Sequence, residues 1–382
     1  MKILIVGAGV AGLTLAALLQ RRGVFPVVIE KAREFDETGY MIGLYPLGSN
    51  IFYGLGCHDE FVKSTCSLTQ YSAFDEGSTL LKSMSLDEIS NRFGPYQCGT
   101  RSNLIRVLEQ SCQANTIQFN TIIEHLNQTN GQVQVTFSNG KTDHFDLVVG
   151  ADGFHSQVRK FILLPDEIEI YDSGWGGWVW WSEHNPFPAE TIYEHWGTRT
   201  FFGGYPVAGK LGVIACVPYP SEASALQGGS RRHYLLNKFS IISILYPEIF
   251  AALPSDNDNL FFWPLADRRC RRWVNHRVVL LGDAAAAFLP TAGIGASMAM
   301  ESAAVLNDVL SRTNAYYLPE TLKLFVARRQ QRVENAQRDS RRLAKLAFVT
   351  PPLMAWIRNF YTKRASTKKL LGSIVNSFDV PI

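Results

Sequence analysis

The sequence predicts an α/β fold in which both ends of the chain build a parallel sheet and a mostly antiparallel β domain is inserted between them. Residues 2–6 and 26–30 have the continuous apolar pattern of buried strands, and residues 10–22 between them have the length of a helix. A strand, a helix and a strand within thirty residues form the unit that builds a parallel sheet with a right-handed crossover. From about residue 165 to 265 helical periodicity disappears, aromatic residues concentrate, and Gly and Pro become frequent. A buried-strand pattern returns at 278–281.

The rest of the chain alternates between the two periodicities. Leu104, Val107 and Leu108 have helical spacing, and Asn139-Gly140 is a turn signal between two strand patterns. Helices are expected at 101–113, 293–311, 319–346 and at least once within 348–380, and strands at 116–120, 132–137 and 145–150. We therefore expect a discontinuous nucleotide-binding domain, a second domain inserted into it, and C-terminal helices. The expected boundaries are 1–66, 97–164 and 266–345 for the first domain, 67–96 and 165–265 for the second, and 346–382 for the helices.

Composition excludes several classes of function. The 382 residues suffice for about two to three domains, and 46% hydrophobic with 19% charged residues is ordinary for a globular protein. The net charge is only +3, and the first 300 residues hold no compact basic block with interleaved aromatics, so nucleic acid is not an expected partner. No apolar run approaches the about 20 residues that span a bilayer. The composition gives no prediction of the oligomeric state.

The N-terminus and the cysteines indicate a cytoplasmic protein. The first strand runs directly into a glycine motif, which leaves no room for a secretion signal. The six cysteines are scattered and form no C-x-x-C pair, so we expect a reducing compartment and no metal site.

The glycine motif is Gly7-Ala8-Gly9-Val10-Ala11-Gly12, which has the G-x-G-x-x-G spacing and lies between a strand and a helix. Its first glycine permits the tight turn, its second lets the backbone approach a pyrophosphate, and its third lets the helix pack on the sheet. The N-terminus of the helix offers free N–H groups and a partial positive charge to phosphates. Glu30 ends the next strand, where it can accept hydrogen bonds from ribose hydroxyls, and Lys31 follows it.

Two later stretches distinguish between the dinucleotides. Residues 146–159 contain Asp152-Gly153 and end at Arg159, and residues 277–295 contain Gly282-Asp283 followed by Pro290 to Gly295. These stretches closely resemble the D-G and G-D fingerprints of flavoprotein hydroxylases. Together with the N-terminal motif, in the same order, they make the chain similar to the class A flavin-dependent monooxygenases, the family of para-hydroxybenzoate hydroxylase and the tetracycline-inactivating monooxygenases. The resemblance implies a Rossmann-type FAD-binding domain with an inserted substrate domain.

The resemblance also implies which residues hold a non-covalent FAD. Asp283 would bind ribityl or ribose hydroxyls, Arg101 would reach the pyrophosphate or ribityl region, and Asp152 and Arg159 are linked in the family to FAD and to the transient pyridine nucleotide. The turn from Pro290 to Gly295 would open a helix beneath the isoalloxazine, with its N–H groups facing the pyrimidine edge. The predicted cofactor set is Gly7, Gly9, Ala11, Gly12, Glu30, Lys31, Arg101, Asp152, Gly153, Arg159, Gly282, Asp283, Pro290, Gly293, Ile294 and Gly295.

The second motif departs from the family pattern at four positions. Ala286 stands where the family often has histidine, Ile294 replaces a common glutamine, Ser297 a common asparagine, and Ser302 a common aspartate. Backbone geometry should survive these changes, whereas the electronics of the flavin and the substrate class are put in doubt.

The inserted domain carries the substrate candidates. A tryptophan run extends from Trp175 to Trp181, and strand alternation would place Trp178 and Trp180 on one face with Val179 and Trp181 on the other. The face toward the flavin would form a flat apolar slot for a ring, although such aromatics more often fill a core. The pocket candidates are Trp178, Trp180, Tyr205, Phe262 and Trp263, while His155, His184 and His195 have no motif partner, so no catalytic side chain is assigned.

The function implied by the resemblance is that of an FAD-dependent monooxygenase. Such an enzyme uses NAD(P)H and dioxygen to hydroxylate a small, aromatic or polycyclic substrate through a flavin hydroperoxide. No second complete dinucleotide fingerprint provides a standing NAD(P)H site, so access of the nicotinamide is expected to be transient. The alternatives are a reductase of the same fold, a flavin-binding scaffold without turnover, and a flavin-dependent halogenase. Halogenases carry W-x-W-x-I-P, and here Trp178-Val179-Trp180-Trp181-Ser182-Glu183 lacks Ile-Pro.

The C-terminal region is rich in arginine. Its long helix at 319–346 is interpreted as a bridge between the two domains, with nucleic acid or a membrane surface as alternatives. Peripheral membrane contact by residues 346–364, which include Phe348, Leu353, Trp356 and Phe360, is a less favoured alternative.

Overall fold

A computed structural model describes residues 1–35, 39–129, 131–219, 231–255, 260 and 262–366. Near the N-terminus lies a six-stranded sheet. Five of its strands run parallel to one another, and the sixth, at one edge, pairs antiparallel with its neighbour. Its strands in spatial order are β18 (Val274–Asn275), β19 (Val278–Leu280), β12 (Leu147–Gly150), β1 (Ile3–Val6), β2 (Val27–Ile29) and β8 (Ile117–Gln118). The central strands are buried on both faces, which explains their continuous apolar sequences. The sheet joins strands from both ends of the chain, as the sequence predicted.

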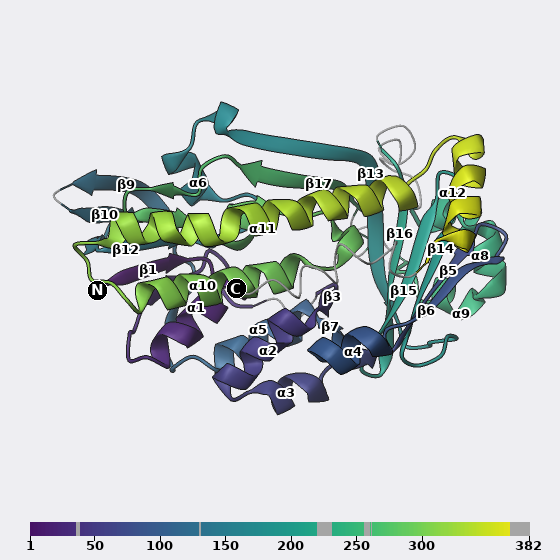
Figure 1. Cartoon of the computed structure of the whole chain (residues 1–382), viewed down its shortest axis with the longest axis horizontal. Helices are drawn as coiled ribbons and strands as arrows, with labels where there is room; N and C mark the ends of the chain where they lie inside the picture. Colours follow the sequence, from purple (N-terminus) through teal and green to yellow (C-terminus); the bar gives the residue numbers. More distant parts are fainter. Residues whose placement is uncertain (36–38, 130, 220–230, 256–259, 261, 367–382) are drawn as a thin grey trace.

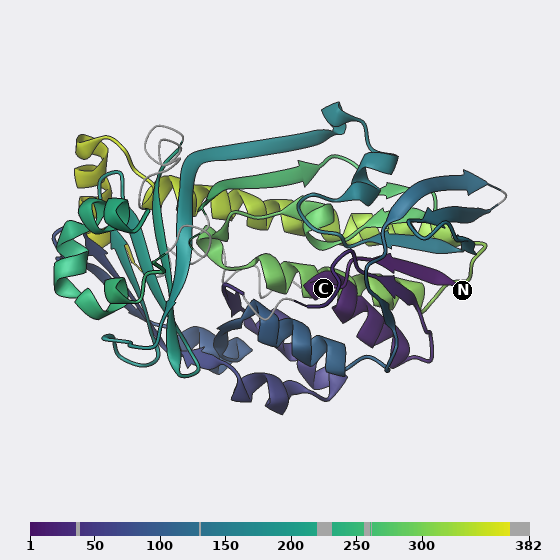
Figure 2. The ribbon, with the colours of Figure 1, turned by 180° about the vertical axis from the view of Figure 1, so that it is seen from behind.

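An eight-stranded sheet forms the other end of the molecule, on the right in Figure 1. Its order is β20 (Ala286–Ala287), β17 (Phe262–Cys270), β13 (Ile168–Ser182), β16 (Lys210–Pro218), β15 (Phe201–Val207), β14 (Thr191–Trp196), β5 (Gln70–Asp75) and β6 (Leu80–Ser85). All neighbouring pairs are antiparallel except β14 with β5. The long strand β13 bends between Asp172 and Gly176, where its register with β17 shifts, and Figure 2 shows it running from the side of the six-stranded sheet into this sheet. The mixed α/β class with a mostly antiparallel second sheet is confirmed.

Two three-stranded sheets complete the described strands. One consists of β11 (Thr142–Phe145), β10 (Gln132–Phe137) and β9 (Ile123–Thr129), and the other of β3 (Met41–Leu44), β7 (Tyr96–Thr100) and β4 (Cys66–Leu68). The second one contacts the eight-stranded sheet through β7 and β4, which both pack near β15. Its third strand, β3, contacts α10 (Gly295–Leu310).

Each helix that the sequence predicts up to residue 366 is present, and the structure adds helices at 46–55, 58–63, 87–93 and 157–162 that the sequence analysis did not predict. The helices are α1 (Val10–Gln20), α2 (Pro46–Leu55), α3 (His58–Lys63), α4 (Asp87–Phe93), α5 (Arg101–Gln110), α6 (Gln157–Ile162), α7 (Arg231–Lys238), α8 (Ser240–Leu245), α9 (Pro247–Ala251), α10 (Gly295–Leu310), α11 (Leu318–Ala347) and α12 (Pro352–Arg364). The sequence prediction was wrong for α7 to α9, since it expected no helix between 165 and 265. These helices are too short to produce a periodic signal, and they bury Leu235, Ile242 and Phe250 against the eight-stranded sheet.

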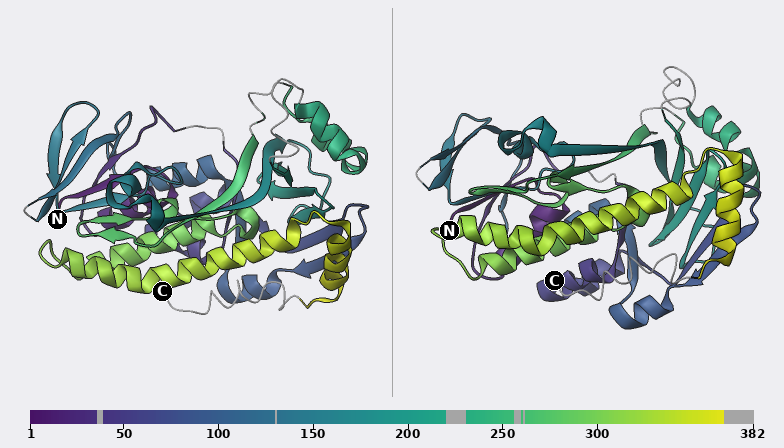
Figure 3. Two further views of the ribbon diagram at one scale, coloured as in Figure 1. Left: turned by 90° about the horizontal axis from the view of Figure 1, so that it is seen from above. Right: turned by 45° about the horizontal axis from the view of Figure 1, so that its top comes forward.

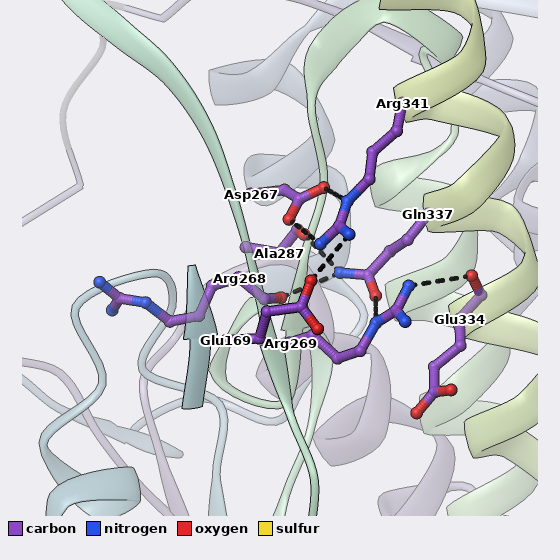
Figure 4. Close-up of polar contacts among 8 residues, drawn as sticks. All are labelled: Glu169, Asp267, Arg268, Arg269, Ala287, Glu334, Gln337 and Arg341. Atoms are coloured by element: carbon purple, nitrogen blue, oxygen red, sulfur yellow. Dashed lines mark hydrogen bonds and ion pairs between the residues drawn. The ribbon is translucent and has the colours of Figure 1, made fainter. Parts of the chain in front are cut away.

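The long helix α11 joins the two ends of the molecule. It runs beside α10 near the N-terminal sheet and reaches the eight-stranded sheet, as both views in Figure 3 show. Arg341 donates to both carboxylate oxygens of Asp267 on β17 at 2.7 Å and to Glu169 on β13 at 2.8 Å. Gln337 donates to the backbone oxygens of Arg268 and Ala287, as Figure 4 shows. The bridging interpretation of the Arg-rich helix agrees with these contacts.

At the C-terminus, α12 packs against β6, and the predicted helical region after residue 366 lies outside the described residues. No helix within the described part of the chain is long and apolar enough to cross a membrane. The domain boundaries given above remain predictions.

Candidate active site

One large cavity lies between the two main sheets. Its volume is about 1900 Å³, and it runs from the first turn of α1 past Asp283 to the face of the eight-stranded sheet. The predicted cofactor residues that line it are Gly9, Ala11, Arg101, Gly153, Asp283, Pro290, Gly293, Ile294 and Gly295. These residues come from segments far apart in the sequence. The fold therefore brings the three fingerprint motifs to one continuous space.

The glycine loop fits a pyrophosphate. Gly7 has φ of +104°, and a Cβ there would lie 2.5 Å from the backbone oxygen of Ala151. A Cβ at Gly12 would lie 2.0 Å from the oxygen of Gly7, so helix and strand approach as closely as the motif requires. At Gly9, by contrast, nothing lies within 4 Å of a built Cβ, and this glycine borders the cavity. The first turn of α1, which has no acidic side chain, thus faces open space.

Glu30 holds this loop through hydrogen bonds from backbone N–H groups to its carboxylate. One carboxylate oxygen accepts from the backbone N–H of Ala8 at 2.9 Å, and the other accepts from Ala32 at 3.0 Å. Among the described residues that line the cavity, neither Glu30 nor Lys31 is found, and Lys31 is exposed. The structure therefore assigns Glu30 first to holding the loop, which is a role that sequence reasoning did not give it.

Glu30→Ala is expected to weaken FAD binding by about 1–3 kcal/mol, because it leaves the Ala8 N–H and the ribose hydroxyls without an acceptor. Titration of the apoprotein with FAD, followed by quenching of flavin fluorescence, measures the change. Glu34→Ala, at an exposed position on the same segment, is the control and should leave the affinity unchanged. Equal FAD affinity for wild type and Glu30→Ala would remove Glu30 from the site.

Asp283 faces the cavity at the beginning of a 3₁₀ turn, Gly282–Ala284, in which Gly282 has φ of +60°. Burial raises the pKa of its carboxyl group to about 6, and Arg101 and Arg159 oppose this rise. The side chain is nevertheless open to solvent through the cavity, so its solvation depends on whether the cavity is filled. Arg101 borders the same space and supplies the positive charge. A carboxylate and a guanidinium in these positions suit the hydroxyls and phosphates of FAD.

The turn after Asp283 is held by Tyr45, the residue between β3 and α2. Gly293 ends the 3₁₀ turn Pro290–Ala292 with φ of +60°, and α10 begins at Gly295. Tyr45 donates its hydroxyl to the oxygen of Ala292 at 3.0 Å, and its backbone N–H donates to Ser297 Oγ at 2.9 Å. Ser297, one of the four departures from the family pattern, thus ties α10 to the segment before α2.

Asp152 and Arg159 hold structure beside the cavity rather than lining it. One oxygen of Asp152 accepts from the backbone N–H groups of Gln157 and Val158 at the start of α6, and its other oxygen is buried without a partner. Arg159 is 2% exposed and donates to the backbone oxygens of Ala284 and Phe154. The guanidinium therefore links α6 to the turn that carries Asp283. Gly7, Gly12 and Gly282 likewise shape the backbone without bordering the space.

The five predicted substrate-pocket residues do not all border the cavity; some lie in the core of the second domain. Tyr205, Trp263 and Trp180 border the cavity, although the Trp180 indole N–H donates to the oxygen of Ile249 in α9. Trp178 and Phe262 do not border it, because both pack into the core under α7 to α9, with ring centroids 4.8 Å apart. The expected alternation is present: Val179 and Trp181 both border the cavity, whereas on the other face Trp178 and Trp180 pack in the core and Trp180 alone also borders the cavity.

Sequence reasoning missed the polar centre of the substrate side. Glu194 on β14 borders the cavity and accepts from Tyr71 at 2.5 Å, Tyr205 at 2.7 Å and the indole of Trp196 at 2.9 Å. Burial raises the pKa of its carboxyl group, and these three hydrogen bonds oppose the rise. The available signal was an acidic residue in the middle of the aromatic strand Thr191–Trp196.

The three histidines do not meet at the site. His195 is 1% exposed, and burial lowers its pKa to about 4, so the ring is neutral at pH 7. His155 borders the cavity, and His184 is exposed at the end of β13. Among the described residues no cluster of His, Cys, Asp or Glu could hold a metal ion.

Comparison with known proteins identifies the family. The family model described as "FAD binding domain" matches residues 1–340, which is most of the chain. The chain belongs to this FAD-binding family of class A flavin monooxygenases. This family member is 29% identical over 350 residues to 3-amino-4-hydroxybenzoate 2-monooxygenase of Streptomyces cremeus, covering 90% of this chain and 87% of the relative. It is 28% identical over 364 residues to 2-heptyl-3-hydroxy-4(1H)-quinolone synthase of Pseudomonas aeruginosa, covering 94% and 93%.

A solved structure has the same fold as this flavin monooxygenase. Klebsiella pneumoniae HpxO complexed with FAD and uric acid superimposes with a TM-score of 0.87 at 23% identity, covering 99% of this chain and 96% of that one. This structure confirms the fold class. The family match and the named relatives confirm the predicted family and FAD as the cofactor, and the protein is an FAD-dependent monooxygenase.

Proposed function

We propose that this flavin monooxygenase uses NAD(P)H and dioxygen to hydroxylate a small aromatic or polycyclic compound in the cytoplasm. The observation that supports the proposal is the continuity of the cavity, which joins the three FAD motifs to a wall of aromatic side chains without an intervening layer. Relatives named for acting on an aminohydroxybenzoate and a quinolone support a ring-bearing substrate. Six free cysteines suit a reducing compartment.

The residues of this chain would divide the work along the cavity. The first turn of α1 would hold the pyrophosphate of FAD, Asp283 and Arg101 would hold its ribityl and phosphate groups, and the Pro290–Gly295 turn would face its ring. Bound FAD would supply the redox chemistry between the pyridine nucleotide and dioxygen. The route through a flavin hydroperoxide stays a prediction.

The substrate side would position the ring and exclude water. Trp263, Tyr205 and Val179 present flat or apolar surfaces to the cavity. Tyr40 lies beside Trp263, with ring centroids 6.5 Å apart, at the junction of the two regions. A ring held there would lie between the cofactor motifs and Glu194.

The test begins with the purified protein, which is expected to be yellow and to release FAD on heating. NADPH or NADH oxidation and dioxygen uptake are then followed with phenols, quinolones and tetracyclines. A true substrate should accelerate both by about tenfold or more, and mass spectrometry should find one added oxygen atom, because the nicotinamide is expected to reach the flavin only when the ring is bound.

Three outcomes would contradict the proposal in different ways. A colourless protein that cannot be reconstituted with FAD contradicts FAD-dependent activity. A reduced product without dioxygen uptake indicates a reductase of the same fold. Reduction of the flavin at the same rate with and without every compound contradicts substrate-gated access, while product with added oxygen would still support hydroxylation.

A further inference from the structure

The polar cluster around Glu194 is built from three strands of the eight-stranded sheet. Tyr71 comes from β5, Glu194 and Trp196 from β14, and Tyr205 from β15. Tyr71 and Trp196 donate to one oxygen of Glu194, and Tyr205 donates to the other. Three donors fixed by sheet pairing hold the carboxylate in one orientation at the cavity surface.

This carboxylate keeps room for one more donor. An ionised carboxylate has about four acceptor positions, and three are used here. Among the described residues Glu194 forms no ion pair, and the titratable groups that face it are neutral at pH 7. They are Tyr71 from β5, Tyr205 from β15, Tyr96 from β7, Cys216 from β16 and Tyr45 beside β3. An anion surrounded by neutral donors attracts a further donor or proton from whatever fills the cavity.

The cluster also reaches the cofactor side. Tyr96 stacks on Tyr45 with ring centroids 4.3 Å apart, and its hydroxyl would lie 2.6 Å from a Cβ built on Gly293. Tyr45 in turn donates to Ala292 in the same turn. Tyr45 and Tyr96 lie near enough to Glu194 for their charges to interact with it, and both line the same cavity as Glu194. A ring that fills the cavity beside this turn would therefore share that cavity with the Glu194 carboxylate.

We propose that Glu194 is the residue that binds and deprotonates an acidic ring O–H or N–H group of the substrate, with Tyr71, Tyr205 and Trp196 as positioning residues. The proton leaves the ring heteroatom and forms an O–H bond on Glu194, and the bonding electron pair stays on the ring. The resulting anion is richer in electrons and is therefore the better acceptor of an oxygen atom. This inference rests on the proposed function and narrows its substrate class to rings with an acidic hydroxyl or N–H.

Binding to the FAD-loaded protein tests the proposal without turnover. The probes are phenol paired with anisole, and 4-hydroxyquinoline paired with 4-methoxyquinoline, each followed by its perturbation of the oxidised flavin spectrum. Each hydroxyl compound should bind at least about tenfold more tightly than its methyl ether, which is the effect of one hydrogen bond to a charged group. Glu194→Gln should remove that preference, whereas Glu183→Gln, the same change at an exposed residue just after the end of β13, should keep it.

The pH dependence separates a proton acceptor from a merely structural residue. The carboxylate form accepts the proton, so affinity for the hydroxyl compounds should fall as the pH drops through the pKa of Glu194, which burial holds above its ordinary value of 4.5. Glu194→Asp keeps a carboxylate and should keep this fall, while Glu194→Gln should abolish it. FAD content and thermal unfolding of each variant establish that the protein is folded.

Two results would overturn the inference. One is equal binding of hydroxyl and methoxy compounds, or no binding of either hydroxyl compound at millimolar concentration. The other is an unchanged preference and pH dependence in Glu194→Gln. Flavin reduction by NAD(P)H and dioxygen uptake with another substrate would leave the proposed function standing in both cases.

Discussion

Gly12→Val is expected to abolish FAD binding and to lower the free energy of unfolding of the apoprotein by about 3 kcal/mol or more. A Cβ at this position would lie 2.0 Å from the backbone oxygen of Gly7 and 3.2 Å from Ile5 Cγ2. The backbone of Gly7 cannot yield, since its N–H donates to Ile29 and it lies against Ala151. The helix α1 must therefore move off the sheet, which removes its N-terminus from the phosphates. FAD titration and urea unfolding measure the two effects.

Gly54→Ala is the matched control for this substitution. Gly54 lies within α2, is exposed, and has nothing within 4 Å of a built Cβ. Alanine there should leave FAD binding unchanged and stabilise the helix by about 0.5–1 kcal/mol. Wild-type FAD affinity in Gly12→Val would show that the close approach of α1 is not needed for the cofactor.

Glu301→Gln is expected to cost about 3–5 kcal/mol of stability, because it leaves a buried guanidinium without its counter-charge. Glu301 on α10 and Arg329 on α11 are both fully buried, with an N–O distance of 2.8 Å, and Arg332 lies 2.7 Å from the other carboxylate oxygen. Burial already lowers the pKa of Arg329, and Glu301 opposes that effect. The substitution keeps the volume of the side chain, so the loss of charge is the main change. Urea unfolding of the FAD-free protein measures it.

Two further variants test whether the loss of stability in Glu301→Gln comes from the unpaired buried charge. Replacing both buried partners, Glu301→Gln with Arg329→Met, should recover part of the lost stability, because the fully buried guanidinium is removed while Arg332 still loses its contact with the Glu301 carboxylate. Glu320→Gln, which breaks the exposed pair of Glu320 and Lys323, should cost less than about 1 kcal/mol. If Glu301→Gln cost no more than Glu320→Gln, the buried pair would not stabilise the packing of α10 on α11.

The parts of the fold that follow long periodic segments could be predicted from the sequence. The helices α10 and α11 are long enough for their sequence pattern to indicate a helix, and the short apolar run Ile3–Val6 is identified as a strand by its length and by the glycine motif that follows it. The helices α7 to α9 could not be found in this way, because each has only five to eight residues. Their apolar side chains are recognised as helical faces only once the sheet that they cover is known.

The same distinction applies to the site. The phosphate loop could be predicted because its chemistry resides in backbone spacing, which Gly7, Gly9 and Gly12 display directly. The Glu194 cluster could not, since Tyr71 lies 123 residues away in sequence and meets Glu194 only through pairing of β5 with β14. Strand alternation predicted which residues of β13 share a face. Which of the two faces borders the cavity could not be predicted, because it depends on α7 to α9, which cover Trp178.

The continuity of α11 constrains how ligands enter and leave. Its 30 residues, at a rise of about 1.5 Å each, make a rod about 45 Å long. Its N-terminal half is fixed to α10 by Arg329, and its C-terminal part is fixed to β17 and β13 by Arg341. A hinge motion that opened the cavity would have to bend this rod or break buried ion pairs. Exchange of cofactor and substrate is therefore expected to leave the angle between the two sheets constant, so that local movements of single segments set the rates of entry and release.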